Sequence, residues 1–306
     1  MPNWRNILDE IGTVRANCEA SARAANDFVR RQYLQKLHEY SERNVIAYYS
    51  GWLSKQNVSG VEINDEDKNG FMMAVHGIDK SLGLDLMLHT PGGDIASTQS
   101  LVDYLQKMFG TNIRAIVPQI AMSAGTMLAC SCREIIMGKH SNLGPIDPHL
   151  RGIPAAGVKR EFDRACKEVQ NDPSKLGIWS QVIRQYRPTF LSQCENAITW
   201  SNAFVRDQLT AVMFEGQRGA KKKARSIVRK LASFSGNKTH ARHIYLEECD
   251  TIGLNVVQLE DDEQMQDLVL TVHHCYMHTL MNTTAYKIIE NQMGNAMVKT
   301  ISVVQR

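Results

Sequence analysis

Long apolar segments are missing from this chain of 306 residues. No stretch reaches the roughly 20 apolar residues that a bilayer-spanning helix needs. The amino terminus, MPNWRNILDEIG, is charged from its start and lacks the apolar run of a secretory signal. We therefore expect a soluble protein without an integral membrane segment.

A strong charge of one sign and paired cysteine motifs are missing too. The net charge is only +3, which is too mild to predict a nucleic-acid partner. The basic run RGAKKKARSIVRK is interpreted as a solvated helix face. The seven cysteines are scattered, and none form a CxxC pair, so we expect free thiols and a cytoplasmic location.

What is present is a hydrophobic content of 43%, enough for a substantial core. Residues 3–43 show apolar side chains at helical spacing and predict one long helix that packs on the body or on another subunit. The period then changes, and apolar strand patterns alternate with amphipathic helix patterns. The expected strands cover 45–53, 84–89, 113–120 and 134–138, and the expected helices cover 64–78, 95–109 and 123–131.

This alternation predicts an α/β fold with a parallel sheet built from right-handed crossovers. A loop at 138–157, helical segments over 158–234 and a strand–helix–strand unit at 243–259 follow, and another helix begins at about 262. The resulting division is an N-terminal helical extension (1–44), an α/β domain (45–260) and a C-terminal helical segment (261–306).

Two strand-to-helix turns carry the chemistry, HTPGGD at 89–94 and QIAMSAG at 119–125. The carboxyl ends of parallel strands are where such folds place ligands. Gly92 and Gly93 leave backbone N–H groups uncovered, which suits an anion or the oxyanion of a tetrahedral intermediate. An ordinary tight turn is the alternative.

Ser123 is the hydroxyl of the second turn, and small residues surround it, including Ala124 with its backbone N–H. A serine at this position often only caps the helix. A serine that faces a Gly-Gly turn, however, is the geometry that acyl transfer needs. Each positioned oxyanion donor contributes about 2.7–4 kcal/mol in such reactions.

HTPGGDIAS, AMSAGTMLA and SNLGPIDP, in this order, resemble the ClpP-class serine peptidases, and within them the signal peptide peptidase A and serine dehydrogenase proteinase (SDH proteinase) branch. The resemblance extends through THARHIYLEECDTIGLNV and NTTAYKIIEN and covers roughly residues 45–300. It implies a ClpP/crotonase-like spiral of βα units, a homo-oligomer and hydrolysis of peptide bonds without a metal or organic cofactor. It also implies Ser123 as the nucleophile and the N–H groups of Gly93 and Ala124 as the oxyanion hole.

The general base is less determined. The motif GPIDP matches the peptidase A type, whose base is a lysine at the start of the next helix, and the residue at that place is Lys159. A lysine must have its pKa lowered from about 10.4 to roughly 7–8 for this role. His149, about 25 positions after the serine as in ClpP, is the alternative base.

These features predict a serine endopeptidase with a Ser123–Lys159 dyad, acting on peptide or protein substrates. Two other functions stay open. A crotonase-type acyl-CoA enzyme would use the same donor pair for an enolate but needs no serine nucleophile, and a catalytically silent scaffold or binding protein would keep only the fold.

Overall fold

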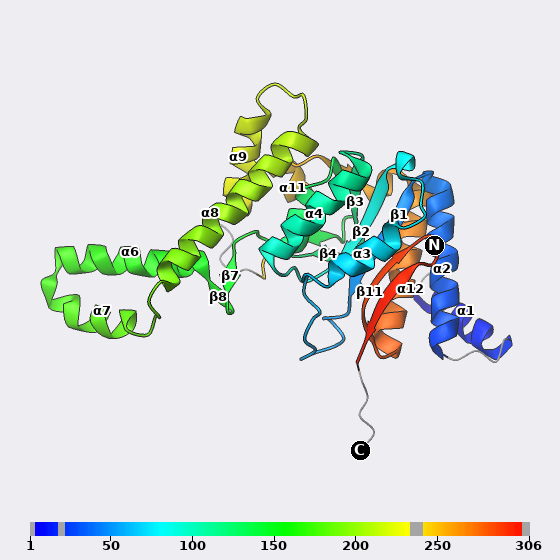
Figure 1. Ribbon diagram of the computed structural model, residues 1–306, viewed down its shortest axis with the longest axis horizontal. Coiled ribbons are helices and arrows are strands. Elements are labelled where there is room, and N and C mark those ends of the chain that lie inside the picture. The colour runs from blue at the N-terminus through cyan, green and yellow to red at the C-terminus, as the bar shows by residue number, and fades with distance from the viewer. Residues whose placement is uncertain (1–3, 18–21, 233–240, 302–306) are drawn as a thin grey trace, which may run out of the picture.

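The computed structural model describes residues 4–17, 22–232 and 241–301. A seven-stranded sheet with the order β10-β5-β3-β2-β1-β11-β12 forms the centre of this part of the chain (Figure 1). The first five strands in this order are parallel, whereas β11 is antiparallel to both of its neighbours, β1 and β12. The strands are β1 Asn44–Ser50, β2 Leu84–His89, β3 Ile113–Val117, β5 Glu134–Met137, β10 Val256–Gln258, β11 Ala285–Asn291 and β12 Ala296–Thr300. The expected α/β fold is confirmed.

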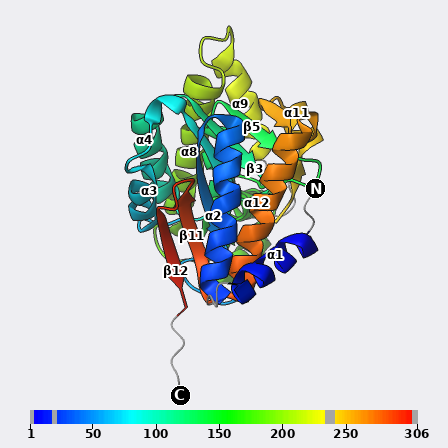
Figure 2. The same cartoon turned by 90° about the vertical axis from the view of Figure 1, so that its right-hand side faces the viewer.

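Helices cover both faces of this sheet. One face packs against α3 Asp67–Val75, α4 Ile95–Phe109, α5 Ala124–Cys130, α8 Phe190–Gln208, α9 Ala220–Leu231 and α11 Leu246–Ile252. The other face packs against α2 Ala22–Ser41 and α12 Glu263–Asn282, which lie side by side in Figure 2. Short strands flank the sheet: β4 Ile120–Ala121, β6 Asn142–Leu143 and β9 Ile244–Tyr245 pair together, and β7 His149–Leu150 pairs with β8 Ile153–Pro154.

Strand β2 shows how the sequence places its side chains in two layers. Leu86 and Leu88 belong to the core on the α4 side, whereas Met87 between them belongs to the core on the α12 side. Successive side chains of a strand point to opposite faces, so a strand that is covered on both faces is apolar at almost every position. This explains why apolar residues follow one another without alternation at Leu86, Met87 and Leu88 of β2.

The N-terminal segment differs from the single long helix expected over 3–43. It forms two helices, α1 Trp4–Asn17 and α2, and these contact each other. Ile7 and Ile11 of α1 are buried in a cluster with Val29 of α2 and Cys275 of α12. One continuous helix could not fold back on itself in this way, so burial of this second apolar stripe accounts for the two-helix arrangement.

The C-terminal segment also differs from expectation, because in its described part, 261–301, the chain is helical only as far as Asn282. The chain then forms β11 and β12, which extend the sheet beyond β1 because β11 pairs with β1. Alternating burial of Ile288 and Ile289 on opposite faces stabilises this hairpin, and such tertiary pairing overrides a helical reading of the segment.

An arm projects from the body (Figure 1). It consists of α6 Ala155–Asn171, α7 Leu176–Ile183 and the first part of α8, which returns the chain to the sheet. A small apolar cluster of α6 and α8 holds the base of the arm, whereas α7 has no buried residue. Across the described ranges, no helix is long and apolar enough to cross a membrane.

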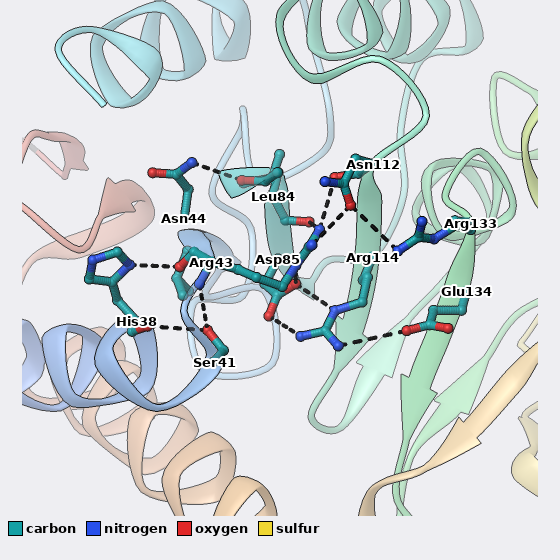
Figure 3. A network of polar contacts seen from close by, with 12 residues as sticks. His38, Ser41, Arg43, Asn44, Leu84, Asp85, Asn112, Arg114, Arg133 and Glu134 are labelled. Carbon is teal, nitrogen blue, oxygen red and sulfur yellow. Dashed lines mark hydrogen bonds and ion pairs between the residues drawn. The ribbon is translucent and has the colours of Figure 1, made fainter. Parts of the chain in front are cut away.

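A polar network joins the amino ends of the parallel strands (Figure 3). The buried carboxylate of Asp85 in β2 accepts hydrogen bonds from Arg43 (2.6 Å) and from two nitrogens of Arg114 in β3 (2.8 and 2.6 Å). Arg43 also binds the side chain of Asn112, and Arg114 lies 3.7 Å from Glu134 of β5. Burial alone would lower the pKa of Arg114, but its hydrogen bond to Asp85 raises it.

Candidate active site

Ser123 occupies the turn between β4 and α5 in a backbone conformation that L residues rarely adopt. Its φ is +51° and its ψ is −113°. Residues in such sparsely populated regions cost on the order of 1–3 kcal/mol and concentrate at functional sites. The hydroxyl makes no capping hydrogen bond to α5, and none of the described residues is its hydrogen-bond partner. Helix capping therefore does not explain this serine.

The glycine turn after β2 lies directly against Ser123. Gly92 has a φ of +96°, and a Cβ atom there would lie 2.6 Å from the carbonyl oxygen of Met122 and 2.7 Å from Cβ of Ser123. Such distances are shorter than any real contact, so only glycine permits this approach of the two turns. The expectation that the two turns lie at the ends of neighbouring strands is confirmed, because β2 pairs with β3 and Thr90 bridges Ala121.

Gly93 is held from one side by the backbone of Ile63. The Ile63 N–H donates to the Gly92 carbonyl (2.8 Å), and the Asp94 N–H donates to the Ile63 carbonyl (2.9 Å). In such a parallel bridge, the N–H and C=O groups of the residue between the two bonded positions, here Gly93, point away from the partner segment. The N–H of Gly93 is thus directed away from Ile63, and within the described ranges it has no acceptor.

The N–H of Ala124 is the second open donor. Ala124 is the first residue of α5, so its N–H has no carbonyl partner inside the helix. Among the residues that the structure describes, it has no other acceptor either. Two N–H groups from adjacent turns, with a partly exposed serine between them, can hold the negative oxygen of a tetrahedral intermediate.

His89 precedes the glycine turn and is fully buried. Its Nδ1 lies 3.0 Å from the carbonyl oxygen of Ser50, and its Nε2 lies 3.0 Å from Oε1 of Gln119. Its ring packs on Trp52 at a centroid distance of 4.5 Å. Burial lowers the pKa of His89 to about 4. This histidine has both ring nitrogens engaged and supports the end of β2.

Lys159 is not brought to Ser123 by any contact of the described chain. It stands in the first turns of α6, as the sequence predicts, but on the arm, where its side chain is 44% exposed. Its Nζ donates to Oε1 of Glu195 on α8 at 3.0 Å and lies 3.9 Å from Asp163. The hydrogen bond to Glu195 raises the pKa of Lys159. This is opposite to the shift that a general base needs.

His149, the alternative base, lies in different surroundings at the foot of the arm in β7. Its Nε2 is 3.5 Å from Oδ2 of Asp147, whose side chain is 3% exposed. The segment that leads to it is anchored near the serine, because Gly144 donates to the Ala121 carbonyl and packs against Met122. An imidazole beside a buried carboxylate is the usual composition of an acid–base pair.

Sequence patterns did not identify Ile63, the residue that aligns Gly93. It lies in VEIN, a short stretch between a strand and a helix, and its contribution is made by backbone atoms, which leave no signature in the side-chain sequence. Across the described ranges, the structure contains no group of three or more His, Cys, Asp or Glu side chains arranged to hold a metal ion.

The mainly parallel α/β fold, with a strained serine against a glycine turn at the strand ends, is an arrangement that a serine hydrolase could use. The chain belongs to the family of ClpP-like SDH-type serine proteinases, which it matches over residues 28–289. This membership confirms the resemblance in HTPGGDIAS and AMSAGTMLA and supports a peptidase function.

Two relatives come from Methanocaldococcus jannaschii, and both bear the description of uncharacterized proteins. Uncharacterized protein MJ0137 is 27% identical over 214 residues, which are 70% of this chain and 65% of the relative. Uncharacterized protein MJ1495 is 26% identical over 194 residues, which are 63% of this chain and 59% of the relative. The similarity thus spans less than two thirds of the relatives' own lengths.

Proposed function

We propose that the protein is a serine peptidase in which Ser123 is the nucleophile and the N–H groups of Gly93 and Ala124 form the oxyanion hole. The observation that carries this proposal is the packing of Gly92 against a strained, uncapped Ser123, with an open N–H donor on each turn. A crotonase-type reaction needs the two donors but gives no reason for the strained serine.

In the proposed reaction, Oγ of Ser123 attacks the carbonyl carbon of the peptide bond while a base accepts its proton. The carbonyl oxygen becomes an oxyanion and receives hydrogen bonds from Gly93 and Ala124. The C–N bond then breaks, and the leaving amine takes the proton from the protonated base. Water, deprotonated by the same base, attacks the acyl-serine; the bond between the acyl carbon and Oγ then breaks, Oγ takes the proton back from the base, and the carboxylic acid is released.

The base is where the two candidates differ. The Ser123–Lys159 dyad stays a prediction. For Lys159 to act as the base, its ion pair with Glu195 must open, and α6 must move so that the amine reaches Ser123. His149 lies beside the buried carboxylate of Asp147 instead, and its use as a base would not require the Lys159–Glu195 ion pair to open. The surroundings therefore favour His149 as the base of the described chain, with Lys159 as the second candidate.

Hydrolysis of fluorescein-labelled casein tests the function. The wild type should cleave it, and Ser123→Ala should reduce kcat by about a thousandfold or more. Cleavage that survives in Ser123→Ala would contradict the assignment of the nucleophile. If the acyl-CoA or scaffold alternatives were correct, the wild type itself would show no cleavage.

Activity measurements on three variants, Glu195→Gln, His149→Ala and Lys159→Ala, distinguish between the two candidate bases. If Lys159 is the base, Glu195→Gln should increase activity near neutral pH, because loss of the carboxylate lowers the pKa of this lysine. If His149 is the base, Glu195→Gln and Lys159→Ala should both retain wild-type activity, while His149→Ala loses about a hundredfold or more.

Assembly and location belong to the proposal as well. We infer a homo-oligomer, because Leu176 and Ile178 of the arm are 57% and 70% exposed and apolar. A cytoplasmic location is supported by free thiols at every cysteine in the described part of the chain. Sedimentation equilibrium of the wild type and of Ile178→Lys would test the assembly, since a monomeric wild type contradicts it.

A further inference from the structure

A lysine is buried in the central sheet, close to the candidate site but outside it. Lys287 of β11 and Asp67 at the start of α3 have side chains that are 0% and 1% exposed, and Nζ lies 2.8 and 2.9 Å from the two carboxylate oxygens. Burial lowers the pKa of Lys287, and the charge of Asp67 opposes this shift. Apolar residues of similar size often stabilise a core as well as such a pair does, so stability alone is a weak reason for it.

Two further hydrogen bonds of the pair go to the backbone on both sides of Ile63. Nζ of Lys287 donates to the carbonyl oxygen of Glu62 (2.7 Å), and Oδ2 of Asp67 accepts from the backbone N–H of Asn64 (3.1 Å). The hydroxyl of Tyr48 donates to the same Oδ2 at 2.8 Å. The ion pair therefore fixes the peptide groups before and after Ile63.

Ile63, in turn, is the residue whose backbone aligns the glycine turn. It donates to the carbonyl of Gly92 and accepts from the N–H of Asp94. The contact is close, because a Cβ atom on Gly93 would lie 2.3 Å from the Ile63 carbonyl oxygen. A shift of this backbone by a fraction of an ångström must therefore move Gly93.

We propose that Lys287 and Asp67 are positioning residues for the oxyanion hole: by fixing residues 62–64, they hold the N–H of Gly93 toward Ser123. This inference rests on the proposed peptidase function. It also gives Lys287, within the NTTAYKIIEN segment, a role that reaches the site through backbone contacts. Oxyanion donors act through exact placement, and a misplacement of about 1 Å can cost on the order of a hundredfold in rate.

The same strand supplies a matched control. Glu290 of β11 forms a second fully buried ion pair, with Arg30 of α2 at 2.6 Å, on the opposite face of the sheet. Its other partners are Arg31, Tyr276 and, through Arg30, Thr279, all on α2 or α12. None of these contacts involves residues 62–64 or the glycine turn, so loss of this pair removes a buried charge without disturbing the site.

The test compares Lys287→Met with Arg30→Met in two measurements on the folded full-length protein. The first is the rate constant for inactivation by a fluorophosphonate, measured below the melting temperature of each variant. Lys287→Met should react about tenfold more slowly or worse, and Arg30→Met should stay within about twofold of the wild type. Tyr48→Phe, which removes one donor to Asp67 and keeps the ion pair, should slow the reaction by about two- to fivefold and serves if Lys287→Met does not fold.

The second measurement is amide hydrogen exchange at Ile63 and Asp94, the two donors that align Gly93. Exchange should accelerate in Lys287→Met and Tyr48→Phe but not in Arg30→Met. Unchanged exchange and inactivation in folded variants at Lys287 and Tyr48 would overturn the positioning role. A wild type that never reacts with the fluorophosphonate, but whose exchange responds to Lys287→Met, would instead overturn the peptidase function and leave the alignment of Gly93 established.

Discussion

The parallel strands of this protein end in two different ways. At their amino ends, Asp85 is surrounded by Arg43 and Arg114, and the charged groups are paired across three strands (Figure 3). At their carboxyl ends, two turns meet with backbone N–H groups that have no acceptor in the described part of the chain, and Ser123 has a positive φ. The same strands thus have paired charged groups at one edge of the sheet and, at the other edge, backbone N–H donors that lack an acceptor in the described part of the chain.

The difference distinguishes an edge with compensated charges from the edge at which we propose that the reaction takes place. Open donors and backbone strain reduce stability, so they persist only where the surrounding structure enforces them. The paired edge contributes stability and touches no group of the candidate site. Variants at the two edges should therefore separate the free energy of unfolding from the rate of catalysis.

The largest effect is expected from Asp85→Ala at the amino ends. It leaves two arginines facing each other without their carboxylate and should lower the free energy of unfolding by about 3–5 kcal/mol. Urea denaturation measures this loss. The kcat of the fraction that remains folded should stay within about twofold of the wild type, and a large fall in kcat would show that the two edges are not independent.

Gly92→Ala at the carboxyl ends should instead lower the rate of catalysis. The added Cβ meets Met122, Ser123 and the N–H of Ala124, so it forces the two turns apart. We expect kcat to fall by about a hundredfold or more. Gly110→Ala is the matched control, because Gly110 also has a positive φ but open space around it. Equal activity in the Gly92 and Gly110 variants would contradict the contact between the turns.

Through His89, at the carboxyl end of β2, the stability of the protein should depend on pH. The pKa of His89 in the folded protein is about 4, below the ordinary 6.5, so the unfolded chain binds the proton first as the pH falls. His89 therefore does not reduce the free energy of unfolding above pH 6.5, but it should lower this free energy by about 3 kcal/mol as the pH falls towards 4. His89→Gln should lose this part of the pH dependence in denaturant titrations, whereas His243→Gln, at an exposed position, should keep it.

The smallest effect concerns the strain at Ser123. Ser123→Gly and Ser123→Ala should both be inactive, but glycine accepts a positive φ and alanine does not. We expect Ser123→Gly to be more stable than Ser123→Ala by about 1 kcal/mol, the relief of strain less the greater flexibility of the unfolded chain. Thermal unfolding of the two variants would reveal this difference, and a less stable glycine variant would argue against strain.

The elements that repeat a simple pattern could be predicted from the sequence. Strand β2 and helix α4 begin and end where the pattern of LDLMLH and of 95–109 places them, because period and capping residues act locally. The two turns could also be located, since glycine and proline leave a clear signal.

Features that depend on distant partners could not be predicted in this way. The return of α1 onto α2, the pairing of β11 with β1 and the alignment of Gly93 by Ile63 all require contacts between remote segments. The same holds for Lys159, whose surroundings are set by Glu195, 36 positions further along the chain. The presence of a lysine at this position indicated a possible base, but its partner Glu195 determines the direction in which its pKa shifts.

One measurement tests the reactive edge most directly. The protein would be treated with a fluorophosphonate and digested, and mass spectrometry would locate the adduct. We predict a single phosphonylated residue, Ser123, that is formed at least about a hundredfold more slowly in Gly92→Ala and not at all in Ser123→Ala. An unmodified Ser123, or an adduct on another residue at the same rate in all three proteins, would contradict the account.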